Sequence, residues 1–269
     1  YQDFDNDQNK IYNLPLDKNW VITGPPGSGK SVLAAYRLAQ ISALEKRTRK
    51  SIDKKFFAFN NILVQYMQVA IDALKVRNPS VKTYHRTFFD IFRNGNLGKV
   101  PHYGDDKYHF NWEMIADTLG DEGIRIADHL VIDEGQDLPN DLYRVSRLLC
   151  NNVTVFADEN QIISQDETTK STVSEIMNIV KASNRYELKK NYRNTIQTAI
   201  FSRQFFSGDP DELPELPDKT GEKPSVQGFE SQRGCLEKIA LTADTFDNRT
   251  IGIFVPDKAS IRKTERQLS

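Results

Sequence analysis

One stretch near the amino terminus decides the fold, and it reads Trp20-Val21-Ile22-Thr23-Gly24-Pro25-Pro26-Gly27-Ser28-Gly29-Lys30-Ser31. Its first part, Trp20 to Thr23, is an apolar run of the kind found in buried strands. Its second part matches the pattern of a phosphate-binding loop, or P-loop, in which glycines precede a Lys-Ser pair. The apolar residues from Ser31 to Leu44 have helical spacing. A strand, a P-loop and a helix therefore follow one another along the chain.

Each residue type in this loop serves the binding of a nucleoside triphosphate. The glycines let backbone N–H groups face phosphate oxygens, and the amino end of the following helix adds partial positive charge. We expect Lys30 to reach the β and γ phosphates and Ser31 to hold Mg²⁺. A chance glycine-rich turn is the alternative, and the flanking strand and helix disfavour it. The residues predicted to bind ATP here are Gly24, Pro25, Pro26, Gly27, Ser28, Gly29, Lys30 and Ser31.

A second candidate site follows an apolar strand that ends in acids. Residues His129 to Ile132 lead into Asp133-Glu134-Gly135-Gln136-Asp137. Ligands of α/β proteins bind at the carboxyl edge of the sheet. Because adjacent strand residues point to opposite sides, we assign Asp133 to Mg²⁺ and Glu134 to the base that orients and deprotonates water. The alternative is that these acids only begin a solvated loop, and Asp137 also fits an N-cap of the next helix.

Apolar runs alternate with helical patterns along the rest of the chain. This rhythm predicts an α/β fold of the P-loop NTPase class, in which a parallel sheet has helices on both faces. The stretch from Asn94 to Tyr108 interrupts the rhythm and is predicted to be a loop or small insertion. The predicted strands are Trp20–Thr23, Phe56–Phe59, Val81–Tyr84, Leu130–Ile132, Val153–Phe156 and Tyr186–Leu188.

The chain is predicted to contain one complete domain and part of another. Residues 1–206 are expected to form the ATP-binding domain. Residues 207–224 are rich in proline and acids, which is typical of a linker. Residues 225–269 are expected to begin a second, incomplete α/β unit, with a strand at Thr250–Val255 and a helix at Lys258–Gln267.

Composition excludes several classes of protein. The 269 residues are 38% hydrophobic and 27% charged, with 36 Lys and Arg against 37 Asp and Glu, which is typical of a globular protein without a wholly basic surface. Cys150 and Cys235 lie far apart, which argues against a disulfide framework or a zinc site and favours a reducing compartment. No apolar run approaches the ~18 residues of a membrane span. We therefore expect a cytoplasmic protein without a membrane partner.

The acidic site also resembles a motif of the UvrD/Rep-like superfamily 1 helicases. Asp133-Glu134-Gly135-Gln136-Asp137 is similar to the second motif of that family. Ala157-Asp158-Glu159-Asn160-Gln161 looks like the third motif, and the resemblance implies that Gln161 senses the γ-phosphate. These motifs occur in the family's order along the chain.

Two further motifs complete the resemblance at the nucleotide. Asn191-Tyr192-Arg193 is similar to the fourth motif, which implies that Tyr192 stacks on adenine and that Arg193 reaches the γ-phosphate. Gln8 resembles the glutamine that reads adenine upstream of the P-loop in this family. Read without the other motifs, Arg193 and Gln8 would pass for ordinary surface residues.

The resemblance also implies contacts with a nucleic-acid strand. Phe57-Ala58-Phe59-Asn60-Asn61 is similar to the segment that touches single-stranded DNA, and Thr83-Tyr84-His85 resembles the Thr-Phe-His segment near the DNA path. Phe59, Tyr84 and Phe88 fit buried aromatics equally well. The residues implied in nucleic-acid contact are Phe59, Asn60, Asn61, Thr83 and His85.

The chain departs from the family at three places. Gln161 is followed by Ile162-Ile163-Ser164-Gln165-Asp166 where relatives have aromatic residues that stack on bases. The short interval between His85 and Asp133 leaves little room for the accessory subdomain of many relatives. Nothing after Pro224 resembles the fifth and sixth motifs. These departures put processive unwinding in question.

Together these features imply an ATPase that forms the first RecA-like domain of a nucleic-acid motor, a translocase or helicase acting on single-stranded nucleic acid, with DNA favoured. ATP would close a cleft between two RecA-like domains, and hydrolysis would reopen it. The expected catalytic residues are Lys30, Glu134, Gln161 and Arg193. The alternative is an ATP-dependent switch or assembly module that works with a nuclease or another effector and separates no strands.

Overall fold

The computed structural model describes residues 4–158, 170–206, 213, 215–245 and 251–268. The chain divides into two units, residues 1–222 and residues 223–269.

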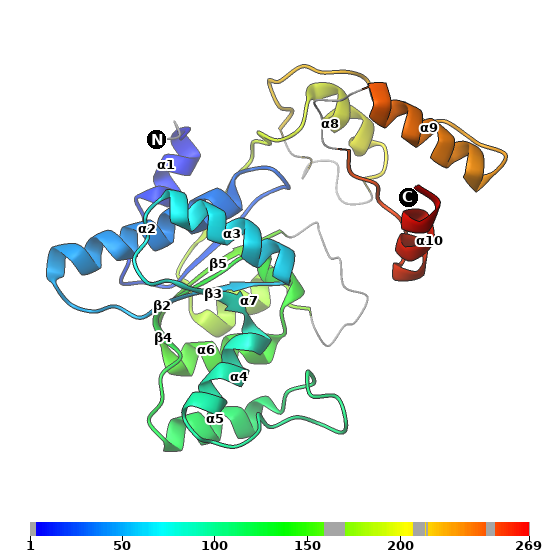
Figure 1. The fold of residues 1–269 in the computed structure, drawn as a ribbon. Helices are drawn as coiled ribbons and strands as arrows, with labels where there is room; N and C mark the ends of the chain where they lie inside the picture. The colour runs from blue at the N-terminus through cyan, green and yellow to red at the C-terminus, as the bar shows by residue number, and fades with distance from the viewer. Residues whose placement is uncertain (1–3, 159–169, 207–212, 214, 246–250, 269) are drawn as a thin grey trace. The chain divides into compact units, whose positions relative to one another are not determined.

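The first unit is built on a sheet of six parallel strands in the order β3-β2-β4-β5-β1-β6. Figure 1 shows this sheet with helices on both sides. The predicted α/β fold is thereby confirmed. Its strands are β1 (Trp20–Thr23), β2 (Lys54–Ala58), β3 (Ser80–Thr83), β4 (Ala127–Ile132), β5 (Cys150–Ala157) and β6 (Arg185–Glu187). Its α-helices are α1 (Asn6–Tyr12), α2 (Lys30–Thr48), α3 (Asn61–Ala73), α4 (Tyr84–Asn94), α5 (Trp112–Asp121), α6 (Asn140–Leu149), α7 (Val173–Val180) and α8 (Ile196–Arg203).

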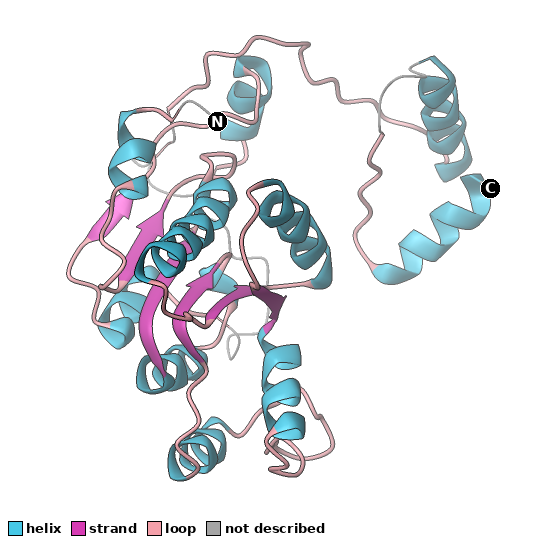
Figure 2. Ribbon diagram, turned by 60° about the vertical axis from the view of Figure 1, so that its left-hand side comes forward, coloured by secondary structure: helices cyan, strands magenta, loops and turns pink. Residues whose placement is uncertain are grey.

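Helices cover both faces of the sheet because neighbouring residues of a strand are buried on opposite sides (Figure 2). In β4, Leu130 and Ile132 belong to one core cluster and Val131 belongs to the other. The first cluster includes side chains of α4, α5, α6 and α7, and the second includes side chains of α1, α2 and α3. Strands that are apolar on both sides are typical of covered parallel sheets.

Element boundaries differ from the sequence prediction by a few residues. The predicted strand at Val81–Tyr84 ends one residue early, because the Thr83 side chain accepts a hydrogen bond from the backbone N–H of Arg86 and caps α4. Tyr84 is therefore the first residue of that helix. The segment after α4 is a loop, as predicted, with an isolated antiparallel bridge between His102 and Phe110.

The region predicted to be a linker has described residues that bond to the first unit. The backbone N–H of Ile196 donates to the carbonyl of Lys219 over 2.7 Å, and that of Gly221 donates to Gln197 Oε1 over 2.8 Å. Lys190 also forms an ion pair with Asp218. The assignment of residues 207–224 as a linker stays a prediction.

The second unit contains α9 (Gln232–Thr245) and α10 (Lys258–Leu268). The helix predicted from Lys258 is present. The strand predicted at Thr250–Val255 is absent over the described residues 251–255. A strand needs a hydrogen-bonding neighbour, and none of the described residues of this unit forms a strand. That residues 225–269 begin a second RecA-like domain stays a prediction.

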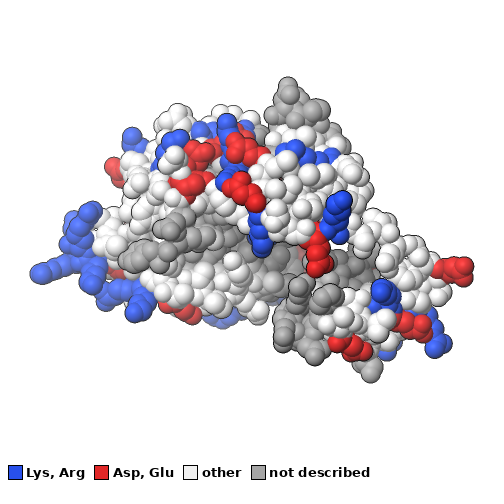
Figure 3. Space-filling model, turned by 90° about the horizontal axis from the view of Figure 1, so that it is seen from above, with Lys and Arg blue, Asp and Glu red and all other residues white. Residues whose placement is uncertain are grey.

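Basic side chains gather at the carboxyl end of α2, where Lys46, Arg47, Arg49 and Lys50 are exposed (Figure 3). Positive charge at this end of a helix complements the helix dipole. The helix has 19 residues, so this basic end lies about 28 Å along its axis from the P-loop. In the parts of the chain that the structure describes, no helix has the length and apolar composition to cross a membrane.

Candidate nucleotide-binding and catalytic site

The P-loop connects β1 to α2 at the carboxyl edge of the sheet. The helix begins at Lys30 behind Gly29, and it has neither a side-chain cap nor an acid in its first turn. Most other helices of the first unit have such a cap, for example Asn60 on α3. The N–H groups at the start of α2 thus lack a side-chain acceptor, which is the condition for binding a phosphate there.

At two positions of the loop, the backbone conformation and the close neighbouring atoms leave room only for glycine. Gly27 and Gly29 have φ values of 79° and 93°, which disfavour other residues. A Cβ on Gly27 would lie 2.6 Å from Asn191 Oδ1, and one on Gly29 would lie 2.7 Å from Gln8 Nε2. The loop is therefore held between α1 and the segment after β6.

Lys30 is buried at the base of the loop. Its ammonium donates to the carbonyl oxygens of Gly24 over 2.5 Å and Pro25 over 3.1 Å. Asp158 Oδ2 lies 3.4 Å from the same nitrogen. Because an ammonium group has three donor hydrogens, these contacts compete with any phosphate oxygen for Lys30.

Asp133 is fully buried at the end of β4, and one of its oxygens has no partner. Its Oδ1 accepts a hydrogen bond from the backbone N–H of Glu134 over 3.1 Å, whereas Oδ2 has no hydrogen-bond partner among the described residues. Burial, aided by the charge of Glu134, raises the pKa of Asp133 to about 6, and Ser31 and Lys30 act in the opposite direction. An unpartnered carboxylate oxygen near a hydroxyl fits Mg²⁺, which prefers oxygen ligands.

Asp133→Asn is expected to raise the free energy of unfolding in the absence of Mg²⁺. The usual pKa of an aspartate is 3.8, and burial raises the pKa of Asp133 to about 6 in the fold. Between these pH values the Asp133 carboxyl ionises only in the unfolded chain, so the free energy of unfolding falls as pH rises. Above about pH 6 the raised pKa lowers the free energy of unfolding by its full amount, about 3 kcal/mol. Urea unfolding with a chelator should show a gain of up to ~3 kcal/mol at pH 7.5 and almost none near pH 4. An equal effect at both pH values would contradict this.

Glu134 leaves the strand in the left-handed conformation, with φ 53° and ψ 46°. Such a conformation costs about 1–2 kcal/mol in a residue other than glycine, so the surrounding contacts must hold it. The Tyr143 hydroxyl donates to the carbonyl of Gly135 over 2.5 Å. A Cβ on Gly135 would lie 2.5 Å from Val155 Cγ1. This tight turn, which the sequence analysis missed, directs the half-buried Glu134 into the cleft.

The segment after β6 is docked on the P-loop. The backbone N–H of Tyr192 donates to the carbonyl of Gly27 over 2.8 Å. Asn191 Oδ1 accepts from the N–H groups of Arg193 over 2.9 Å and Asn194 over 3.1 Å. The Tyr192 and Arg193 side chains are exposed in the cleft, and the Arg193 guanidinium forms no ion pair with a described residue. The positioning role of Asn191 was not foreseen.

Gln8 is buried beside the loop, where it has a structural role. Its Nε2 donates to the carbonyl of Ser28 over 3.1 Å, and its Oε1 accepts from the N–H of Asp5 as part of a capping box on α1. Gln8 also lines the cleft, so its predicted contact with adenine stays a prediction. The sequence signal that could have identified this structural role of Gln8 is the Asp5-to-Gln8 spacing of a capping box.

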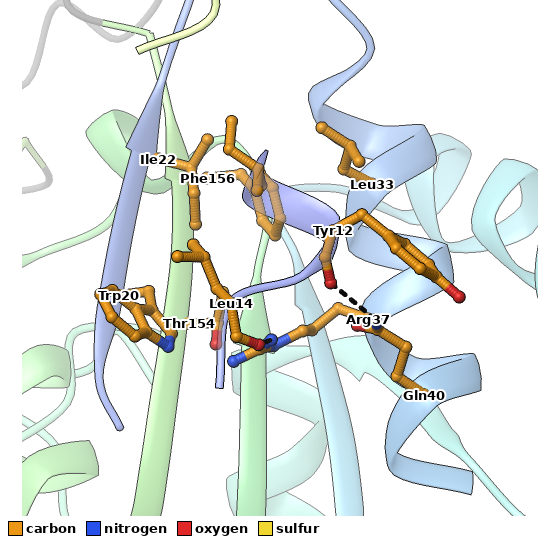
Figure 4. Close-up of a pocket in the computed structure, with 10 residues that line it drawn as sticks. Tyr12, Leu14, Trp20, Ile22, Leu33, Arg37, Gln40, Thr154 and Phe156 are labelled. Carbon is orange, nitrogen blue, oxygen red and sulfur yellow. Dashed lines mark hydrogen bonds between the residues drawn. The ribbon is translucent and has the colours of Figure 1, made fainter. Parts of the chain in front are cut away.

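A small cavity on the side of the sheet that α1 and α2 cover is lined by residues of α1, β1, α2 and β5 (Figure 4). Arg37 is one of the lining residues, and its guanidinium donates to the carbonyl oxygens of Leu14 and Pro15, each over 2.5 Å. Gln40 Nε2 donates to the carbonyl of Tyr12 over 2.6 Å. Burial lowers the pKa of Arg37 to about 10, and the charge of Asp17 opposes this. These bonds anchor the chain between α1 and β1 on the helix that follows the P-loop.

One cleft collects most of the predicted nucleotide-site residues. Two residues in it, Val32 and Tyr66, were not predicted; Tyr66 comes from α3 and is 59% exposed. Gln161 lies outside the described residues, as do Ile162 to Asp166. The cleft is lined by Gln8, Pro26, Gly27, Gly29, Lys30, Ser31, Val32, Tyr66, Glu134, Tyr192 and Arg193.

The residues implied in nucleic-acid contact lie outside this cleft. Asn60 caps α3, with Oδ1 accepting from the N–H of Leu63 over 2.9 Å, and Asn61 beside it is exposed. Phe59 is partly buried and packs against the core. Thr83 caps α4, and His85 Nε2 lies 3.2 Å from the carbonyl oxygen of Tyr108. The aromatics Tyr84 and Phe88 are buried core residues.

The sequence matches the model of a known protein family. The family described as Schlafen group 3, DNA/RNA helicase domain, matches residues 17–212. No curated protein matches the chain.

Among solved structures, Pif1 helicase from Candida albicans is similar over 98% of this chain and 61% of its own, with 14% identity and a TM-score of 0.48. Pif1 helicase from Bacteroides, in complex with ADP-AlF3 and ssDNA, is similar over 97% of this chain and 62% of its own, with 17% identity and a TM-score of 0.41. The chain thus spans about three fifths of the length of these helicases.

The family match covers more than half of the chain and includes every residue around the cleft except Gln8. The chain belongs to the Schlafen group 3 family of DNA/RNA helicase domains.

Proposed function

We propose that this domain binds and hydrolyses Mg-ATP in the cleft and that hydrolysis drives movement along, or unwinding of, nucleic acid. The observation that carries the proposal is the convergence of Lys30, Glu134 and Arg193 on one cleft at the carboxyl edge of the sheet. These residues come from three separate segments of the chain. Membership of a DNA/RNA helicase domain family supports nucleic acid as the partner.

Each residue has a proposed role in ATP hydrolysis. Lys30 and the uncapped amino end of α2 bind the phosphates. Ser31 and Asp133 would hold Mg²⁺, which would neutralise negative charge on the phosphates. Glu134 accepts the proton of the attacking water, and Arg193 stabilises charge that develops on the γ-phosphate.

The finer assignments follow the UvrD/Rep-like motifs. Tyr192 would stack on adenine and Gln8 would read its edge. Gln161, outside the described residues, would sense the γ-phosphate. We propose that a single strand, with DNA favoured, passes over the ends of β2 and β3, where the contact residues would be Phe59, Asn60, Asn61, Thr83 and His85. A complete motor needs a second RecA-like domain to close the cleft, and residues 225–269 would be its start.

The alternative function is an ATP-dependent switch that assembles with a nuclease or another effector. The sequence Ile162-Ile163-Ser164-Gln165-Asp166, which lacks base-stacking aromatics, favours it. Without aromatic side chains on which bases stack, a motor that steps along a strand loses about 1–3 kcal/mol of binding free energy per base.

The ATPase rate of the complete natural protein, measured with and without single-stranded DNA and RNA, tests the proposal. A motor should hydrolyse ATP much faster on the strand, because each step of movement uses a cycle of cleft closure. A measurable rate that no strand changes would favour the switch. Absence of hydrolysis under all conditions would contradict the assignment of an ATPase.

Arg193→Ala and Tyr192→Ala are expected to have opposite effects on binding and turnover. Arg193 would contact a group that ADP lacks, so its loss should slow hydrolysis far more than it weakens ADP binding. Tyr192 would grip adenine in ATP and ADP alike, so its loss should weaken both by a similar amount, on the order of 1–3 kcal/mol. Titration of both nucleotides and steady-state hydrolysis in the complete protein measure the two patterns. An unchanged hydrolysis rate in Arg193→Ala would show that Arg193 is not part of the site.

A further inference from the structure

Gln136 is a buried amide whose hydrogen bonds join two parts of the site. It lies in the 3-10 turn η1 (Gly135–Asp137) after β4 and is 2% exposed. Its Nε2 donates to Glu134 Oε2 over 2.9 Å and to Asp137 Oδ2 over 3.4 Å. Its Oε1 accepts from the backbone N–H of Asp158 over 2.9 Å. One side chain therefore ties the acid after β4 to the end of β5.

The order of strands places this junction between the P-loop and Glu134. β5 lies between β1, which leads into the P-loop, and β4, which leads into Glu134. Asp158 directly follows β5, and its carboxylate lies 3.4 Å from Lys30 Nζ. A chain of contacts thus runs from Lys30 through Asp158 and Gln136 to the Glu134 carboxylate.

The position also requires an amide. The backbone N–H of Asp158 needs an acceptor, and the carboxylate of Glu134 needs a donor. Glutamate offers only acceptors and leucine offers neither, whereas a primary amide has both. The donor also matters because Glu134 stands next to the buried Asp133 in a left-handed conformation that is not intrinsically favoured.

We propose that Gln136 is a positioning residue for ATP hydrolysis, which fixes the Glu134 carboxylate relative to the P-loop through Asp158. The inference rests on the proposed role of Glu134 as the base. Gln136 lies outside the residues that line the cleft, so it acts through Glu134 rather than on the nucleotide. Its loss should slow the hydrolysis step and leave Mg-ATP affinity almost unchanged.

The test is a double-mutant cycle in the complete natural protein. Gln136→Glu keeps the acceptor for Asp158 and removes the donor, and Gln136→Leu removes both. Each change is made alone and together with Glu134→Gln. Single-turnover hydrolysis gives the rate of the chemical step, and titration gives the Kd for Mg-ATP. Gln68→Leu is the matched control, since Gln68 is an exposed amide on α3 that bonds to Asp72.

Both Gln136 variants should hydrolyse ATP about 10- to 100-fold more slowly than the wild type, with the Kd changed less than about twofold, as expected when a reacting group is misplaced slightly. In the Glu134→Gln background they should cause no further loss, because residues that act as a unit are not additive. The Gln68→Leu variant should match the wild type.

Three outcomes would overturn the inference. The first is an equal loss of rate in both backgrounds, which would show a general structural role. The second is an unchanged rate in both variants. The third is loss of nucleotide binding or of folding in both variants, which would show that Gln136 holds the fold. Failure of the proposed function looks different: the wild type would not hydrolyse ATP, or Glu134→Gln would hydrolyse it normally.

Discussion

Lys30→Ala is expected to abolish useful ATP binding. The ammonium of Lys30 is the main side-chain charge that can meet the β and γ phosphates, and Lys30 is buried at the base of the cleft. Charge-assisted hydrogen bonds contribute about 1.5–3 kcal/mol each, so the loss of contacts to both phosphates should weaken binding by about 10²- to 10⁴-fold. Calorimetric titration with Mg-ATP measures the effect.

The control for Lys30 is an exposed lysine elsewhere in the first unit. Lys18→Ala, in the turn before β1, should bind ATP as the wild type does. Lys30→Ala also removes the hydrogen bonds that Lys30 donates to the carbonyl oxygens of Gly24 and Pro25. Cooperative unfolding must therefore show that the variant is folded. Unaltered affinity in a folded Lys30→Ala protein would contradict the assignment of the P-loop.

Glu134→Gln is expected to separate binding from hydrolysis. The amide keeps the shape of the side chain but cannot accept the proton of water, so hydrolysis should fall by about 10²-fold or more. Mg-ATP should remain bound, because the proposed metal ligands Ser31 and Asp133 are intact. Single-turnover hydrolysis and nucleotide titration in the complete protein measure the two effects.

The matching control is Glu122→Gln, which changes an exposed glutamate at the end of α5 and should leave both quantities unchanged. If affinity for Mg-ATP fell as far as turnover in Glu134→Gln, Glu134 would have to be reassigned to the metal. Equal turnover in wild type and Glu134→Gln would remove Glu134 from the reaction altogether.

The turn that places Glu134 in the cleft destabilises the fold. Asp133 is buried with a raised pKa, and Glu134 adopts a left-handed conformation beside it. Buried like charges and backbone strain are concentrated at functional sites, where surrounding structure compensates for them. Tyr143 and Gln136 provide that compensation through their bonds to Gly135 and Glu134. A gain in stability in Asp133→Asn would therefore accompany a loss of function.

Much of the fold could be predicted because its signals are local. The strand at Trp20–Thr23 has the predicted bounds, and the other strands of the sheet lie within a few residues of theirs. Apolar runs and helical spacing depend on residues adjacent in the chain. The strand predicted at Thr250–Val255 was wrong over the described residues 251–255. Ile253 and Phe254 belong to an apolar run, but no described residue of the second unit forms a strand with which it could pair. Pairing is a property of two segments.

The candidate site could be predicted in part. The P-loop pattern and the acids after β4 predicted Lys30, Asp133 and Glu134 as site residues, since each motif is continuous in the sequence. The structure adds that these residues share one edge of the sheet, and it places Tyr66 in the cleft that Lys30 and Glu134 line. Tyr66 could not be predicted, because nothing in the sequence of α3 distinguishes an aromatic residue that lines a cleft from one on the open surface.

The sequence by itself determined a strand, a phosphate-binding loop and a helix, followed by a strand that ends in acids, because these signals lie within single segments. Only the tertiary structure decided which polar groups meet. Asn191 is docked against Gly27, and Gln136 joins Glu134 to Asp158, although each pair is distant in sequence. The physical reason is that a parallel sheet brings the carboxyl ends of β1, β4, β5 and β6 to one edge in an order set by strand pairing. Hydrogen bonds across that edge depend on this order, which no periodicity along the chain encodes.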